Sequence, residues 1–142
     1  MGDAIAFHML PFVQKLNWRM DMIVPMPLGK KRTKERGYNQ AALIAKPLAI
    51  ALQVEYAPHA ITRIKETRTQ VGLNKLERKK NVEGAFQADA SVKRKSIVVL
   101  DDVSTTGATL SSIAEALCQA GAARVYALTV ARALQHHSLQ AV

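Results

Sequence analysis

The chain has 142 residues, of which 49% are apolar, so it is long enough and hydrophobic enough for one domain with its own core. The 20 Lys and Arg residues against 11 Asp and Glu give a formal charge of +9, which favours polyanionic ligands. A single cysteine excludes an internal disulfide, and no apolar run approaches the roughly 18 residues that a membrane-spanning helix needs. We therefore expect a cytoplasmic protein that does not bind membranes.

Five elements are expected in the first half of the chain from the spacing of its apolar residues. They are a helix at about residues 4–16, a strand at 22–25, a helix at about 39–52, and strands near 54–56 and 60–63. In the second helix, Ile44, Leu48 and Leu52 recur at helical spacing and should face a sheet. Pro47 conflicts with this helix, because it removes one main-chain hydrogen bond and should kink the helix or cost about 3 kcal/mol.

A polar and charged segment follows between Lys65 and Lys80, and it lacks apolar periodicity. Segments with few buried apolar contacts open easily, so we expect a flexible loop over residues 64–82 when no ligand is bound. A basic loop is likewise expected after the strand at residues 22–25.

Residues 97–100 are four apolar residues that lead directly into two acids, Asp101 and Asp102. Such a run is typical of a strand buried on both faces, and the acids would stand at its carboxyl end, where open α/β sheets bind ligands. Adjacent carboxylates repel each other, and a ribose diol or a hydrated Mg²⁺ would supply the partners that they need. The alternative is a solvated turn before an ordinary helix cap.

The residues after the acids predict a phosphate-binding loop and a helix. Residues 105–109 offer main-chain N–H groups and threonine hydroxyls, and Gly107 lets the backbone approach a ligand closely. A helix is expected from about residue 110 to Gly121, and its amino end would favour a phosphate at the loop. Cys118 would lie on its apolar face as a buried, inert thiol. A strand at 124–131 completes a βαβ unit, whose crossover should be right-handed.

The segment Val98–Thr109 resembles the phosphoribosyl-pyrophosphate (PRPP) signature of the type I phosphoribosyltransferases. In that family the two acids, here Asp101 and Asp102, hold the ribose 2′ and 3′ hydroxyls, and the following loop wraps the 5′-phosphate. The loop residues at the matching positions are Thr105, Thr106, Gly107, Ala108 and Thr109. The resemblance implies the type I phosphoribosyltransferase fold, an α/β fold with a mostly parallel central sheet flanked by helices, a flexible loop and a small hood. We expect one domain over residues 1–142, with residues 1–20 as an N-terminal helix and part of the hood.

More of the chain resembles one branch of that family, the ComF-type competence proteins. The matching stretches lie within roughly residues 20–132 and are Val24–Leu28, Lys31-Arg32, Glu35–Ala41, Gln70, Gly72-Leu73, Arg78, Asn81-Val82 and Gly84–Phe86. Two features depart from the branch, because Gly29-Lys30 replaces a common His-Pro pair and the N-terminal Cys-x-x-Cys zinc ribbon of many members has no counterpart. One cysteine and four scattered histidines cannot build that ribbon, so this is either a short family form or a chain that starts late.

The resemblance implies transfer of a phosphoribosyl group from PRPP to a nitrogen nucleophile in nucleotide or nucleoside metabolism, with the acceptor unassigned. Asp101 and Asp102 would be the catalytic acids, and Mg²⁺ would be held mainly through PRPP, with these acids as further ligands. The residues that would contact the pyrophosphate are Leu28, Gly29, Lys30, Arg36 and Arg68. Gln70 and Arg78 are further candidates on the flexible loop.

The acceptor would be recognised by the hood. His8, Trp18 and Tyr56 could line an apolar pocket there, although a core role suits each of them better. Nothing else in the sequence indicates which acceptor is used.

A second function class stays open: a non-catalytic ComF-type protein that acts in DNA uptake through DNA or protein partners and keeps a PRPP-sensing or vestigial pocket. Basic residues cluster at Lys30–Arg36, Arg63–Lys80 and Lys93–Lys95. They could cage PRPP, bind nucleic acid or be solvated, and we favour solvation for the last cluster. Tyr38, just after the first cluster, is the only aromatic residue that accompanies them, so base stacking has little support, whereas weak, salt-sensitive nucleic-acid binding stays open. We also expect a homo-oligomer.

Overall fold

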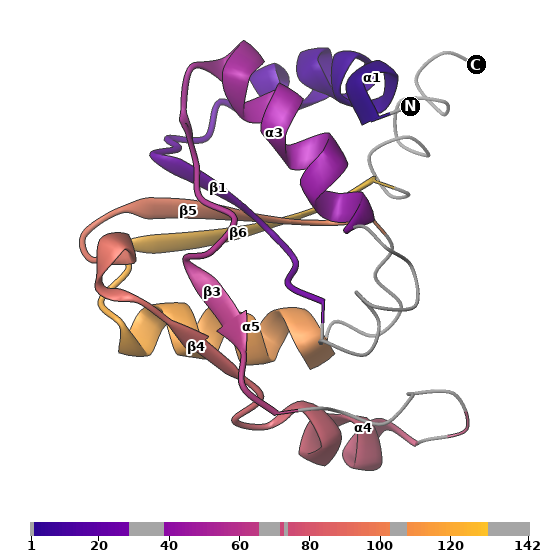
Figure 1. The fold of residues 1–142 in the computed structure, drawn as a ribbon, viewed down its shortest axis with the longest axis vertical. Helices are drawn as coiled ribbons and strands as arrows, with labels where there is room; N and C mark the ends of the chain where they lie inside the picture. The colour runs from indigo at the N-terminus through magenta and orange to yellow at the C-terminus, as the bar shows by residue number, and fades with distance from the viewer. Residues whose placement is uncertain (1, 29–38, 66–71, 73, 103–107, 131–142) are drawn as a thin grey trace.

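The structure, a computed structural model, describes residues 2–28, 39–65, 72, 74–102 and 108–130. Figure 1 shows a central sheet with helices on both of its faces. Its four strands are parallel and stand in the order β2 (Glu55–Tyr56), β1 (Met22–Pro25), β5 (Ser96–Asp101) and β6 (Arg124–Thr129). The expected α/β fold with a parallel central sheet is therefore confirmed.

Two layers cover the sheet (Figure 1). On one face lie α1 (Gly2–Leu16) and α3 (Gln40–Leu52), and on the other lies α5 (Ala108–Gln119). The α5 side also carries an antiparallel pair, β3 (Ile61–Arg63) with β4 (Phe86–Ala88), the helix α4 (Lys75–Val82) and the 3₁₀ turn η1 (Ala90–Val92). Within the described ranges, no helix has the length and apolar character needed to cross a bilayer.

The core lies between these layers, with β5 at its centre. Residues 97–100 are at most 1% exposed, as expected for a strand covered on both faces. From α3, Ile44 and Leu48 are buried and Leu52 is half-buried, as their helical spacing predicts. The helix continues through the half-buried Pro47, because packing of its apolar face outweighs one missing main-chain hydrogen bond.

The apolar pattern does not predict α4, which occupies part of the segment 64–82 expected to be a loop. A local signal marks its start: the Asn74 side chain accepts a hydrogen bond from the Glu77 N–H (2.8 Å), and the Glu77 carboxylate accepts one from the Asn74 N–H (3.3 Å). This reciprocal pair is a capping box, which holds a helix start without any apolar stripe. The flexibility of the segment stays a prediction, because residues 66–71 and 73 lie outside the described residues.

Cys118 is exposed, which contradicts the expectation of a buried thiol. The buried stripe of α5 is formed by Ile113, Ala116 and Leu117. Each residue turns a helix by about 100°, so the position after Leu117 lies off that stripe. A one-residue offset within the helix thus decides the exposure of the thiol.

Candidate functional site

The carboxyl ends of β1 and β5 are neighbours at the point where the strand order reverses. From β1 the chain passes through α3 to β2 on one side, and from β5 it passes through α5 to β6 on the other. Pro25 stands opposite Leu100, and the Met26 N–H donates to the Leu100 carbonyl (2.8 Å). Open α/β sheets bind ligands at such a switch point, outside the carboxyl ends of the strands.

Asp101 and Asp102 lie at this switch point. Asp101 is the last residue of β5 and stands opposite Thr129 of β6, and Asp102 follows directly. Both residues are half-buried, so each has part of its surface in contact with solvent. The two acids stand at the end of a buried strand, as the apolar run before them predicts, and their chemical role stays a prediction.

The amino end of α5 belongs to the same edge of the sheet, because the helix begins at Ala108, shortly after β5 ends. Thr109, in its first turn, is half-buried. The first turn of a helix has N–H groups without intrahelical partners and a partial positive charge, so this end suits an anion. Of the predicted phosphate loop, Thr105, Thr106 and Gly107 lie outside the described residues, and Ala108 is described by its backbone alone.

Two side chains hold carbonyl groups of the turn that follows β1. The Asn39 amide donates through Nδ2 to the Met26 carbonyl (2.9 Å), while its Oδ1 accepts from N–H groups in the first turn of α3. The Arg63 guanidinium donates through Nη2 to the Pro27 carbonyl (3.5 Å). Neither residue is in the predicted site set, although Arg63 belongs to a basic cluster considered as a cage for PRPP. Asn39 carries an N-cap signal before an apolar helix, whereas no local pattern reports the contact of Arg63.

Leu28 comes directly after this turn and is half-buried. It is the one residue of the predicted pyrophosphate set that the structure describes. The others lie outside the described residues and are Gly29, Lys30, Arg36 and Arg68, together with Gln70 of the flexible loop. For Arg78, in α4, the backbone alone is described.

The three residues considered for an acceptor pocket do not come together. Trp18 stacks on Tyr126 of β6, with ring centroids 4.5 Å apart and planes at 12°. Tyr56 lies in β2, which β1 and β5 separate from β6, and burial raises the pKa of its phenol. Both Trp18 and Tyr56 pack against the core, whereas His8 is exposed on α1. A single pocket lined by all three residues is therefore wrong, because the strand order keeps two of them apart.

Comparison with known protein families matches residues 38–139 to the phosphoribosyl transferase domain. The DNA utilization protein YhgH of Escherichia coli (strain K12) is 39% identical over 114 residues, which cover 80% of this chain and 50% of that protein. Competence protein F of Haemophilus influenzae is 34% identical over 116 residues, which cover 80% of this chain and 51% of the relative. The chain thus spans about half the length of the curated relatives it matches.

Solved structures share the fold at low sequence identity. A glutamine PRPP amidotransferase from B. subtilis superposes with a TM-score of 0.60 and 18% identity, over 91% of this chain and 26% of that one. A hypoxanthine phosphoribosyltransferase from Staphylococcus aureus gives a TM-score of 0.52 and 13% identity, over 90% of this chain and 61% of that one. Sheet topology, family match and relatives agree, and the chain therefore belongs to the phosphoribosyltransferase domain family, as a ComF-type member.

Proposed function

We propose that this chain binds PRPP together with Mg²⁺ and transfers the phosphoribosyl group to a nitrogen nucleophile. The observation that carries the proposal is the position of Asp101 and Asp102 at the switch point of the sheet. There they adjoin the turn after β1 and precede the amino end of α5 by one short connection. An acidic pair between two segments that we propose to bind anions suits a sugar that carries a phosphate at one end and a pyrophosphate at the other.

Each part of the site has a chemical task in this proposal. Ionised carboxylates accept strong hydrogen bonds, so Asp101 and Asp102 would hold the ribose 2′ and 3′ hydroxyls. Residues 105–109 and the first turn of α5 would hold the 5′-phosphate through main-chain N–H groups. The pyrophosphate would contact Leu28, Gly29, Lys30, Arg36 and Arg68.

The acidic pair also fits Mg²⁺ as the cofactor. In the described part of the chain, no three His, Cys, Asp or Glu side chains gather as a metal-binding group. Mg²⁺ keeps several of its waters and takes other ligands from substrate phosphates, so one or two carboxylates, here Asp101 and Asp102, suit it. When bound, the ion would neutralise charge on the departing pyrophosphate.

The proposed reaction is a displacement at the anomeric carbon of the ribose. The bond from C1 to the pyrophosphate oxygen breaks, and its electron pair leaves with pyrophosphate. The lone pair of the nitrogen nucleophile forms the new bond to C1, and the nitrogen then releases one proton to solvent. Positive charge develops on the ring, and the nearby carboxylates of Asp101 and Asp102 favour that charge. Water could also attack the anomeric carbon. We therefore propose that the segment 64–82 closes over the bound ligand and keeps water out.

Isothermal titration calorimetry with PRPP, with and without Mg²⁺, tests binding separately from chemistry. We expect binding that depends on Mg²⁺ and a thermal unfolding midpoint that rises with PRPP concentration. Release of pyrophosphate in the presence of ammonia or free bases then tests transfer. The proposal fails if PRPP produces neither heat nor a change in thermal stability.

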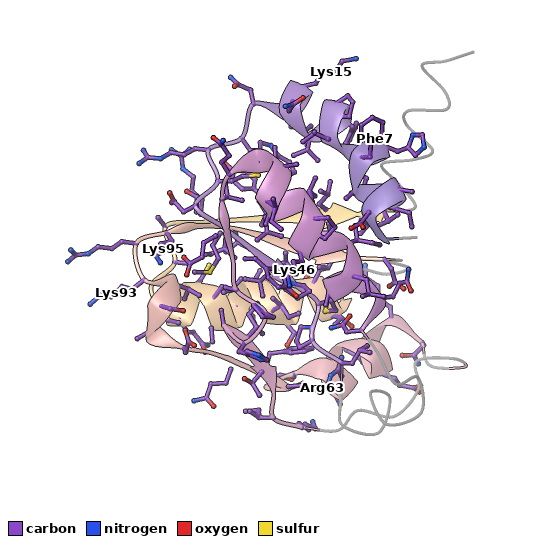
Figure 2. The ribbon with its side chains drawn as sticks, turned by 45° about the horizontal axis from the view of Figure 1, so that its top comes forward. Phe7, Lys15, Lys46, Arg63, Lys93 and Lys95 are labelled. Atoms are coloured by element: carbon purple, nitrogen blue, oxygen red, sulfur yellow. The ribbon has the colours of Figure 1, made fainter. Side chains whose placement is uncertain are left out.

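A second candidate is a non-catalytic role with DNA, and the opposite edge of the sheet favours it. Exposed basic residues gather where β1, β5 and β6 begin, and they are Arg19, Lys93, Arg94 and Arg124. Figure 2 shows Lys93 and Lys95 projecting from this edge. Lys95 forms an ion pair with Glu55 (3.1 Å), so the other cations are better placed for a phosphate backbone. The relatives DNA utilization protein YhgH and Competence protein F carry names that point the same way.

Fluorescence anisotropy with a labelled single-stranded oligonucleotide separates the two candidates. A DNA role predicts binding that weakens with salt and that falls when Arg19, Arg94 and Arg124 are replaced by Gln, with PRPP binding unchanged. Pyrophosphate release without oligonucleotide binding supports the enzyme instead. Retention of full DNA affinity by the triple variant would exclude this edge as the binding surface.

We further propose that the chain self-associates through the layer formed by α1 and α3. Two large apolar side chains on these helices, Phe7 and Ile50, are 74% and 68% exposed. Burial of such side chains between copies would stabilise an oligomer. Light scattering coupled to gel filtration checks the mass, and a monomer at all concentrations contradicts the proposal.

A further inference from the structure

Arg63 joins parts of the molecule that are distant in the sequence. It is the last residue of β3, it stands opposite Phe86 of β4, and its guanidinium reaches the carbonyl of Pro27 after β1. The chain beyond it enters the segment 64–82. In Figure 2, Arg63 lies well apart from Lys93 and Lys95 at the opposite edge. Arg63 is half-buried, whereas most arginines are exposed.

The ring of Phe86 restricts the Arg63 guanidinium. Its Cζ lies 4.8 Å from the ring centroid, within the range of cation–π attraction, and Phe86 is 6% exposed. Just beyond the pair, the Ile64 N–H donates to the Ala85 carbonyl (2.7 Å), so the backbone here is tied to the chain that leads into β4. A planar guanidinium on a buried ring loses little further freedom when it forms a hydrogen bond.

The contact of Arg63 with Pro27 sets the direction of the next peptide group. At 3.5 Å the hydrogen bond is long, and its donor carries a positive charge that attracts the carbonyl oxygen. A trans peptide has its C=O and N–H on opposite sides. Attraction of the Pro27 oxygen toward Arg63 therefore turns the N–H of Leu28 away from Arg63. The preceding carbonyl, of Met26, is held in turn by Asn39 (2.9 Å).

We infer that Arg63 is a positioning residue for pyrophosphate binding. It holds the partially negative Pro27 oxygen out of the anion site and presents the Leu28 N–H as the first main-chain donor to the pyrophosphate. Main-chain N–H groups aligned in this way form anion-binding concavities. The inference rests on the proposed function and adds one residue to it, because Arg63 would make the segment after β1 depend on the β3·β4 pair.

The test compares three ligands, each with Mg²⁺: PRPP, inorganic pyrophosphate and ribose 5-phosphate. Arg63→Met should lower the affinity for PRPP and for pyrophosphate about tenfold, because the peptide between Pro27 and Leu28 loses the contact that orients it. Affinity for ribose 5-phosphate should stay at the parent value, since its phosphate binds at the start of α5. Arg63→Lys, which keeps the charge but not the planar fork, should restore part of the loss. Arg124→Met, at the amino edge of the sheet, is the matched control and should change none of the three affinities.

The ligand pattern separates the outcomes. Equal loss for all three ligands with a lower thermal midpoint would mean that Arg63 only supports the fold, and it would overturn the inference. Parent-like binding of PRPP and pyrophosphate by Arg63→Met would overturn it as well. If the parent chain binds none of the three ligands, the proposed function itself fails, and the inference falls with it.

Discussion

Aspartates at the two edges of the same sheet meet different surroundings. At the amino edge, the Asp21 carboxylate accepts a hydrogen bond from the Ser96 N–H at the start of β5 (2.8 Å), and its own N–H donates to the Ser96 carbonyl (2.9 Å). At the carboxyl edge, Asp101 ends β5 and Asp102 follows it, beside two residues after β1 whose carbonyl groups accept hydrogen bonds from the Asn39 and Arg63 side chains. The first acid completes the backbone pairing of the sheet, whereas the second pair lies at the edge where open α/β sheets bind ligands.

Removal of the acidic pair should give the largest effect on binding. We expect Asp101→Asn combined with Asp102→Asn to weaken PRPP binding about 100-fold or more, because each hydrogen bond to a charged group contributes about 1.5–3 kcal/mol. The unliganded fold should keep its thermal midpoint or gain slightly, since a repelling pair is gone. Calorimetry and thermal unfolding measure both quantities. If the double variant binds PRPP as well as the parent does, the two acids at the carboxyl edge do not contact PRPP.

Asp21→Ala should give the converse result. It leaves the Ser96 N–H without its carboxylate acceptor, so we expect the free energy of unfolding to fall by about 1–2 kcal/mol. PRPP affinity of the folded fraction should not change, because the substitution is at the opposite edge. Urea unfolding measures the first quantity and titration at low temperature the second. Loss of PRPP binding at full stability would contradict the assignment of a purely structural role.

The ion pair between Lys95 and Glu55 should have a smaller effect. Its side chains are 38% and 52% exposed, and exposed pairs typically contribute less than about 1 kcal/mol. We expect Glu55→Gln to change the free energy of unfolding by less than about 0.5 kcal/mol. The same variant frees Lys95, so oligonucleotide binding should strengthen if the amino edge contacts DNA. Urea unfolding and anisotropy test the two expectations, and weaker DNA binding would count against that surface.

Tyr56, in the strand next to β1, should give the smallest effect, confined to alkaline solution. Burial raises the pKa of its phenol, so the folded chain holds this proton more tightly than the unfolded chain does. Its contribution to stability is fully present below the unfolded pKa of about 10 and is lost as pH rises through the folded pKa. Tyr56→Phe should therefore flatten the fall in stability above about pH 10. Identical alkaline slopes for the two proteins in denaturant titrations would show that this phenol is not desolvated.

Much of the fold follows from local patterns. The strand at Met22–Pro25 has the expected bounds, and the buried run at residues 97–100 occupies the centre of the sheet, because continuous apolar segments need cover on both faces. The apolar pattern does not predict the helix α4, because a capping box and not an apolar stripe marks its start. Cys118 was misplaced because one step of helical rotation separates buried from exposed positions.

The candidate site was only partly predictable for a different reason. Asp101 and Asp102 are adjacent to the strand that positions them, so a short pattern locates them. Arg63 meets Pro27 across 36 residues of chain, and Trp18 and Tyr56 are separated by the order of the strands. Contacts of this kind depend on how elements pair in space, and no periodicity within one segment encodes them.

The hydrogen bond between Asn39 and Met26 has a consequence for how this protein tolerates change. It joins the first residue after β1 to the cap of α3, so the two ends of the intervening chain are held together. Closing a longer excursion costs only about 0.6 kcal/mol for each doubling of its length. Insertions between these two anchors should therefore leave the sheet intact, so changes in this span would alter the proposed pyrophosphate contacts without disturbing the scaffold.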